Sequence, residues 1–139
     1  MTEALENSVN AGKSREALDI LVVDDDSINL YLIKTLLLRL GHKVDTARDG
    51  SAAVESFIAK VYDVILMDVM MPVMDGVTAT MEIRKIEVGR KTDPDRFVKI
   101  IAITANTFEE DRASFFTAGM NYYMSKPLQV DELQRLLYC

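Results

Sequence analysis

The stretch "LVVDDDS" (residues 21–27) runs a short apolar segment directly into three consecutive aspartates. The apolar segment begins at Leu18 and is rich in Val and Ile, which predicts a strand buried on both faces of a sheet. Because neighbouring like charges repel, Asp24, Asp25 and Asp26 need a structural or chemical reason to stand together. They could cap a following helix, hold a cation or lie on a solvated loop, and taken alone helix capping is the commonest reason.

The alternation of apolar runs and helical segments continues along the chain. The predicted strands are residues 18–23, 43–47, 63–68, 98–104 and 122–125. The predicted helices are residues 27–40, 50–60, 74–87, 107–119 and 130–139, and a charged loop covers 87–96. This order predicts an α/β fold, a doubly wound (βα)5 sandwich of three layers around a five-stranded parallel sheet. Residues 1–17 are polar and are predicted to form a tail or linker before one domain at 18–139.

Length and composition exclude several classes of protein. A chain of 139 residues with 49% hydrophobic and 27% charged residues is typical of a single globular domain. The net charge of −6 argues against a nucleic-acid-binding surface, which needs clustered Lys and Arg. There is a single cysteine, Cys139, and the sequence shows neither a secretory signal nor an apolar run of membrane-spanning length. We therefore expect a cytoplasmic protein without a disulfide framework or a membrane segment.

Polar residues stand at the ends of the predicted strands, where open parallel sheets bind their ligands. Asp24–Asp26 follow the first strand, Asp68 ends the third, Thr104 ends the fourth, and Lys126 follows the fifth. Clustered carboxylates raise one another's pKa values, and a divalent cation such as Mg²⁺ removes that conflict. A carboxylate nucleophile, a metal, a lysine and a hydroxyl are the parts of a phosphoryl-transfer site that forms an aspartyl-phosphate.

These residues carry a family resemblance. In its segments "VVDDD", "DVILMDVMMPVMDG", "AITA" and "KP", the chain resembles the receiver domain of two-component response regulators. The resemblance extends from about residue 18 to the end of the chain and implies a flavodoxin-like fold for that range. The long loop at 87–96 is similar to that of receivers in hybrid histidine kinases.

The resemblance implies a chemical role for each strand-end residue. Asp68 would be the phospho-acceptor, and Lys126 and Thr104 would contact the phosphoryl group. The ligands of Mg²⁺, or of Mn²⁺ in its place, would be Asp24, Asp25, Asp68 and the backbone carbonyl of Met70. The phosphoryl group would come from a phosphohistidine on a histidine kinase or a histidine phosphotransfer protein.

The resemblance also implies a conformational switch. As Thr104 moves to the phosphoryl group, the aromatic ring of Tyr123 would turn inward. The surface formed by residues 107–119, 122–125 and 130–139 would then change and alter the affinity for a downstream partner or a linked output domain, which the sequence does not identify.

Further residues are expected to shape or tune the site. The peptide bond between Lys126 and Pro127 is a candidate for the cis form. Met70 and Asn106 would flank the path of the hydrolytic water and tune the rate of dephosphorylation. Asp26 would lie outside the metal site, either capping the first helix or facing solvent.

Two other functions compete with this interpretation. A phosphatase of the haloacid-dehalogenase type also uses an aspartate nucleophile and Mg²⁺, but it needs a second aspartate where this chain has Met70. A pseudo-receiver scaffold usually lacks an acid, the threonine or the lysine, and this chain has all of them. Because a receiver is modified once per cycle, we expect a signalling module and not a turnover enzyme. The only histidine, His42, is expected to have a structural role.

Overall fold

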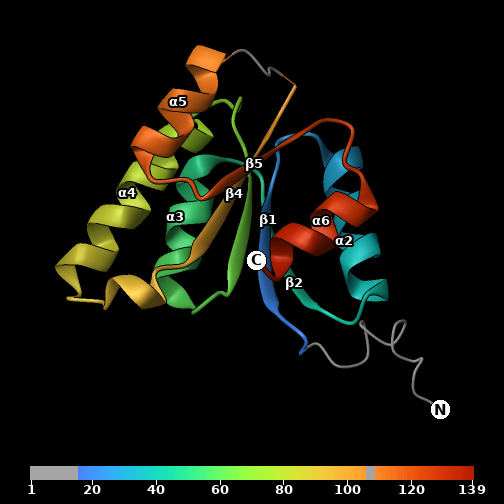
Figure 1. Ribbon diagram of the computed structural model, residues 1–139, viewed down its shortest axis with the longest axis horizontal. Helices are drawn as coiled ribbons and strands as arrows, with labels where there is room; N and C mark the ends of the chain where they lie inside the picture. Colours follow the sequence, from blue (N-terminus) through green and yellow to red (C-terminus); the bar gives the residue numbers. More distant parts are fainter. Residues whose placement is uncertain (1–15, 106–108) are drawn as a thin grey trace.

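The computed structural model describes residues 16–105 and 109–139 and contains one five-stranded sheet (Figure 1). The strands are β1 (Asp19–Val23), β2 (Lys43–Ala47), β3 (Val64–Asp68), β4 (Lys99–Thr104) and β5 (Tyr122–Ser125). The helices are α2 (Ser27–Arg39), α3 (Gly50–Ala59), α4 (Gly76–Gly89), the short 3-10 helix η1 (Pro94–Arg96), α5 (Glu109–Ala118) and α6 (Val130–Leu137). All strands are parallel in the order β2-β1-β3-β4-β5, which confirms the predicted flavodoxin-like α/β fold.

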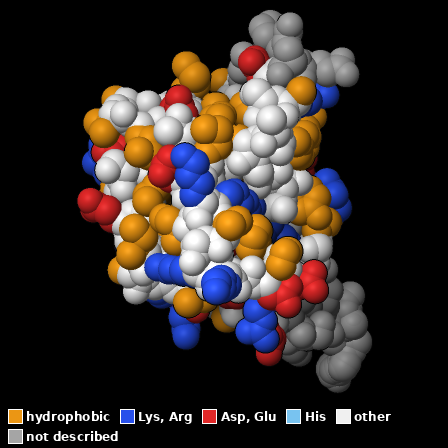
Figure 2. Space-filling view, turned by 90° about the vertical axis from the view of Figure 1, so that its left-hand side faces the viewer, with side chains coloured by type: hydrophobic (Ala, Val, Ile, Leu, Met, Phe, Trp, Pro, Cys, Tyr) orange, Lys and Arg blue, Asp and Glu red, His pale blue; other side chains and the backbone are white. Residues whose placement is uncertain are grey.

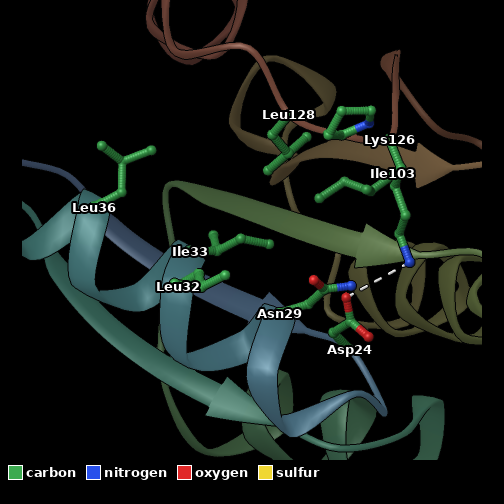
Figure 3. A pocket seen from close by; sticks show the side chains of 9 residues that line it. Asp24, Asn29, Leu32, Ile33, Leu36, Ile103, Lys126 and Leu128 are labelled. Atoms are coloured by element: carbon green, nitrogen blue, oxygen red, sulfur yellow. Dashed lines mark ion pairs between the residues drawn. The ribbon is translucent and has the colours of Figure 1, made fainter.

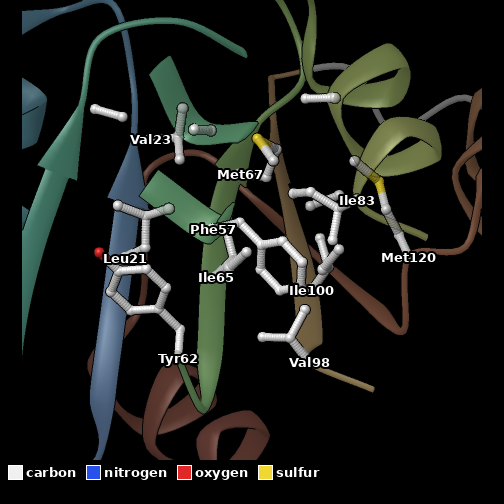
Figure 4. Packing of buried hydrophobic residues seen from close by; sticks show 14 of the residues in the cluster. Leu21, Val23, Phe57, Tyr62, Ile65, Met67, Ile83, Val98, Ile100 and Met120 are labelled. Atoms are coloured by element: carbon white, nitrogen blue, oxygen red, sulfur yellow. The ribbon is translucent and has the colours of Figure 1, made fainter. Parts of the chain in front are cut away.

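The sheet is covered on both faces, and each face has its own hydrophobic core. Helices α2 and α6 lie on one side of the sheet, and α3, α4 and α5 lie on the other (Figure 1). Successive strand residues point to opposite faces, so Leu21 belongs to the core under α3–α5 and Val22 to the core under α2 and α6. Figure 4 shows the first of these cores, in which Phe57 and Ile83 pack over the central strands.

The connection between α4 and β4 differs from the prediction. Residues 87–89 are the last residues of α4, and part of the remaining connection is η1, so the loop predicted at 87–96 is wrong at both ends. Glu87, which the sequence assigned both to the end of the helix and to the start of the charged loop, lies inside α4. Its side chain is buried, accepts the backbone N–H of Val98 at 2.7 Å, and pairs with Arg84 at 2.7 Å. These contacts fix this turn of α4 against the start of β4, and the helix continues to Gly89. The capping box predicted at residues 107–110 lies outside the described side chains.

Three helices begin at an aspartate that follows a strand or a loop. The carboxylates of Asp26, Asp49 and Asp75 accept backbone N–H groups in the first turns of α2, α3 and α4. Of the two roles expected for Asp26, capping the first helix is therefore confirmed, and the residue is also exposed. None of the helices in the described ranges is both long and apolar enough to cross a membrane.

The surface over α4 and α5 mixes side chains of all kinds. Figure 2 views the molecule from the left-hand side of Figure 1, and on this face Lys and Arg side chains are interspersed with hydrophobic and acidic ones. This mixture differs from the continuous basic surface that nucleic-acid binding needs.

Candidate functional site

The strand-end aspartates meet at one edge of the sheet. The register pairs Val23 of β1 with Met67 of β3, so the residues that follow them, Asp24 and Asp68, are neighbours. One carboxylate oxygen from each of Asp24, Asp25 and Asp68 lies within 4.8 Å of the others. Asp24 is 1% and Asp68 3% exposed, whereas Asp25 is exposed. The site therefore has two buried acids and one that faces solvent.

Lys126 brings a cation to the two buried acids. Its Nζ lies 3.7 Å from Asp24 Oδ2 and 3.5 Å from Asp68 Oδ1 (Figure 3 shows the contact with Asp24). Its backbone N–H donates to the Thr104 carbonyl at 2.9 Å, and its peptide bond to Pro127 is cis. The lysine is thus held beside the acids by β4 and by the turn after β5.

Burial and like charge dominate the electrostatics of Asp68. Loss of solvent raises the pKa of Asp68 to about 6, and the negative charge of Asp24 contributes to this shift. Lys126 and the Met70 backbone N–H, which donates to Asp68 Oδ1 at 3.4 Å, act in the opposite direction. The pKa stays raised, so one cation from the protein does not fully offset the two buried acids.

The donor set fits a hard divalent cation. Asp24, Asp25 and Asp68 offer three oxygen ligands within a small space, and carboxylates that lower one another's acidity gain from added positive charge. Mg²⁺ and Mn²⁺ both prefer such oxygen ligands. The side chain of Met70 is 76% exposed, and its backbone carbonyl remains a proposed ligand.

Backbone contacts fix the acidic turn. Asp24 Oδ1 accepts the backbone N–H of Asp26 at 2.9 Å, and Arg48 donates to the backbone carbonyl of Asp25 at 3.0 Å. Gly76 packs so tightly under the site that an added Cβ would collide with the carbonyl oxygen of Asp68. The sequence did not indicate the role of Arg48, because it follows β2 and approaches Asp25 only through the fold.

Thr104 and Tyr123 are the remaining candidate residues that the structure describes. Thr104 is 2% exposed at the end of β4. Tyr123 is half-buried, with its ring edge-on to Phe116 at 6.4 Å between centroids and the Arg112 guanidinium carbon 5.1 Å from its centroid. Asn106 lies outside the described residues.

A groove of about 450 Å³ adjoins the acidic site (Figure 3). It runs between α2, which contributes Leu32, Ile33 and Leu36, and the segment after β5. Asp24 and Lys126 line its polar end together with Asn29, a residue that sequence analysis missed. Only the fold shows that Asn29 lies near Asp24, which stands three residues before the start of α2.

The chain matches a known family and several solved structures. A model of the response regulator receiver domain matches residues 20–138. The chain is 32% identical over 160 residues to "Probable histidine kinase 1" of Oryza sativa subsp. indica, a match that covers 97% of this chain and 16% of that protein. The chain spans between 4% and 16% of the length of the first curated relatives that it matches, several of which are named hybrid signal transduction histidine kinases.

Two solved structures are informative because of what they contain. The receiver domain of the sensor histidine kinase PA1611 from Pseudomonas aeruginosa PAO1, with a magnesium ion coordinated in its active site cleft, is 44% identical. It superposes with a TM-score of 0.76 over 88% of this chain and 95% of that chain. The co-crystal structure of the Saccharomyces cerevisiae phosphotransfer protein Ypd1 and the receiver domain of Ssk1 gives a TM-score of 0.80 at 27% identity, over 87% of this chain and 86% of that chain.

The family match and the geometry agree on the same residues. The matched range includes every described strand-end residue of the acidic site, and the fold places these residues at the edge where open parallel sheets bind ligands. The homologues of this chain are receivers of hybrid histidine kinases. The chain belongs to the response regulator receiver domain family.

Proposed function

We propose that this domain accepts a phosphoryl group from a phosphohistidine onto Asp68 in a Mg²⁺-dependent step. The observation that carries the proposal is the position of Asp68, which is buried beside Asp24 and within 3.5 Å of Lys126. A carboxylate nucleophile that is shielded from water and flanked by a cation is suited to attack phosphorus and not to serve as a surface acid.

Each residue has a separate task in this step. The deprotonated carboxylate of Asp68 attacks phosphorus, and Lys126 stays within reach of the oxygens of the transferred group. Mg²⁺ held by Asp24 and Asp25, with the Met70 carbonyl as a further ligand, would neutralise charge on that group. Asp24 also holds Lys126 in place through the ion pair at 3.7 Å before the phosphoryl group arrives.

The response to phosphorylation would run through Thr104 and Tyr123. The Thr104 hydroxyl would hydrogen-bond the phosphoryl group, and the ring of Tyr123 would move toward the space that Thr104 leaves. Tyr123 lies against Phe116 and Arg112 of α5, so this movement changes the surface formed by α5, β5 and α6. Two arrangements of one aromatic ring, biased by one charged group, make a switch of the usual allosteric kind.

The donor protein would dock over the start of α2. Three exposed apolar side chains there, Ile28, Tyr31 and Leu32, are 58–70% exposed, and Met70 and Val73 extend the apolar character around the site. Exposed apolar residues gathered around a reactive group indicate a protein-binding surface. The resemblance to a receiver domain solved with a phosphotransfer protein supports a histidine phosphotransfer protein or a histidine kinase as the partner. Such partners act in the cytoplasm, where we expect this domain.

The alternative functions have less support. A haloacid-dehalogenase-type phosphatase needs an acid/base two residues after the nucleophile, and Met70 supplies none. A pseudo-receiver would not need both buried acids and the lysine together. We therefore infer a signalling module that catalyses its own modification and is not a turnover enzyme.

Phosphotransfer to a defined residue tests the proposal. The domain is mixed with a phosphorylated histidine phosphotransfer protein and Mg²⁺, and the modified residue is located by mass spectrometry after borohydride trapping of the acyl phosphate. We expect label on Asp68 in the wild type and none in Asp68→Asn, with Asp131→Asn as a control at an exposed acid. Label that persists in Asp68→Asn, or label that forms without a divalent cation, would refute the assignment.

A further inference from the structure

Asn29 contributes a side-chain amide to the polar end of the groove. Asn29 is the third residue of α2 and is half-buried. Its backbone N–H donates to the carboxylate of Asp26 at 3.4 Å, but within residues 16–105 and 109–139 its side-chain amide makes no hydrogen bond. Figure 3 shows that amide beside Asp24, at the end of the groove where Lys126 lies. A half-buried amide in this position is available to a polar group that enters the groove.

The walls of the groove limit what can enter. Leu32 and Leu36 of α2 face Leu128 across it, so the space beside the amide is apolar. An occupant must therefore combine an apolar body with a polar atom at the inner end. It must also bring phosphorus to the side of Lys126 that faces Asp68. An imidazole ring that carries a phosphoryl group on one nitrogen has this combination.

The neutrality of Asn29 also matters. A second cation at this position would compete with Lys126 for Asp24, and another anion would raise the pKa of Asp68 further. An amide forms a directed hydrogen bond without either effect.

We propose that Asn29 is a substrate-contacting residue that orients the imidazole of the phosphohistidine donor. Its side-chain oxygen accepts the N–H of the ring nitrogen that does not carry phosphorus. This inference rests on the proposed function and adds a determinant of donor chemistry to it.

The step balances as a simple displacement. An oxygen of the Asp68 carboxylate forms the new P–O bond, the P–N bond breaks, and its electron pair stays on the ring nitrogen. Because the other ring nitrogen keeps its proton, the donor leaves as neutral imidazole. Asn29 does not touch phosphorus; it fixes the rotation of the ring so that the P–N bond points away from Asp68.

Three phosphodonors separate this role from its alternatives. The experiment measures the rate at which Asn29→Ala is phosphorylated in the presence of Mg²⁺ by each of three donors. These are a phosphohistidine protein, phosphoimidazole, and acetyl phosphate, which has no ring. We expect rates about tenfold lower with the first two donors, the loss expected for one hydrogen bond, and a rate within about twofold of wild type with acetyl phosphate. Asn29→Gln keeps the amide and should recover part of the loss with phosphoimidazole. Lys34→Ala, at an exposed position of α2 that does not line the groove, is the matched control and should leave all three rates unchanged.

The other outcomes contradict the inference in distinct ways. Equal losses with all three donors would mean that Asn29 acts on the acidic site, and no loss with any donor would mean that it contacts none of them. A loss with the protein alone would make Asn29 a docking contact and not an imidazole contact. A wild-type domain that none of the donors phosphorylates would refute the proposed function itself.

Discussion

The ammonium group of Lys126 lies 3.5 Å from the carboxylate of Asp68, and the pKa of Asp68 is nevertheless raised to about 6. Burial is the larger cause and the charge of Asp24 adds to it, so the ion pair does not set the protonation state of the proposed nucleophile. Without a metal, the pKa of Asp68 is therefore higher in the native state than in the unfolded chain.

This raised pKa predicts that Asp68→Asn stabilises the metal-free domain. Between pH 4 and 6 the native state binds more protons at Asp68 than the unfolded state does, so wild-type stability falls as pH rises through that window. At pH 7.5 in EDTA we expect the variant to be more stable by about 1–3 kcal/mol in urea denaturation. The gain should shrink at pH 4.5, and Glu55→Gln, at an exposed acid of α3, should show no such gain. A variant that is less stable than wild type at pH 7.5 would contradict the assigned direction of the shift.

His42 should give the opposite dependence on pH. The ring is 5% exposed, its Nδ1 accepts the backbone N–H of Leu18 at 3.1 Å, and burial lowers its pKa from 6.5. Below pH 6.5 the unfolded state takes up the proton first, so stability is full above that pH and is lost as pH falls. His42→Asn keeps an acceptor for Leu18 but does not titrate. The stability difference between wild type and variant should decline from pH 7.5 to pH 5 by at most about 1.4 kcal/mol per pH unit, and a constant difference would contradict the prediction.

The buried pair of Arg84 and Glu87 should be costly to break from one side. Arg84 also donates to the backbone carbonyls of Val98 and Gly119, so it joins α4 to the start of β4 and to the turn before β5. Arg84→Met leaves Glu87 charged and buried, and we expect a loss of about 3–5 kcal/mol in urea denaturation. The double variant Arg84→Met/Glu87→Gln should lose less than Arg84→Met alone.

The exposed pair of Lys85 and Glu82 on the same helix is the control for that experiment. These side chains lie 3.3 Å apart in solvent, and Lys85→Met should change stability by less than about 1 kcal/mol. If Arg84→Met cost no more than Lys85→Met, the network around Glu87 would not contribute to stability.

Gly76 should tolerate no side chain. An added Cβ would collide with the carbonyl oxygen of Asp68 and would approach the Met67 side chain to 2.9 Å. We expect Gly76→Ala to lower stability by about 1–3 kcal/mol and to weaken Mg²⁺ binding in titration calorimetry, because the strand end of Asp68 must shift. Gly89, in the same helix, has open space around its Cα, and Gly89→Ala should leave Mg²⁺ binding unchanged. Equal Mg²⁺ affinities for both variants would show that Gly76 does not support the site.

The sequence predicted the parts of this site that depend on topology. Asp24, Asp68, Thr104 and Lys126 each end or follow a strand, and the rule that ligands bind at the carboxyl ends of parallel strands was enough to group them. The third aspartate was also predictable, because an acid directly before an apolar helix is a frequent cap.

Residues whose roles depend on packing were not predictable in the same way. Glu87 was assigned both to the end of a helix and to the start of a charged loop, and only the fold brings the Val98 amide to it. Asn29 looked like one polar residue of a helix. Its significance depends on the path of the chain after β5, which lies about 100 residues further along the sequence.

The two separate cores have a consequence for where this domain can move. Phe115 of α5 belongs to the core on one face of the sheet and Leu133 of α6 to the core on the other, with β5 between them at the edge of the sheet. The α5–β5–α6 surface therefore spans two hydrophobic cores that lie on opposite faces of the sheet. Tyr123 packs against the first core, beside Phe116 and Arg112 of α5, so a change in the position of its ring would alter the α5 side of this surface.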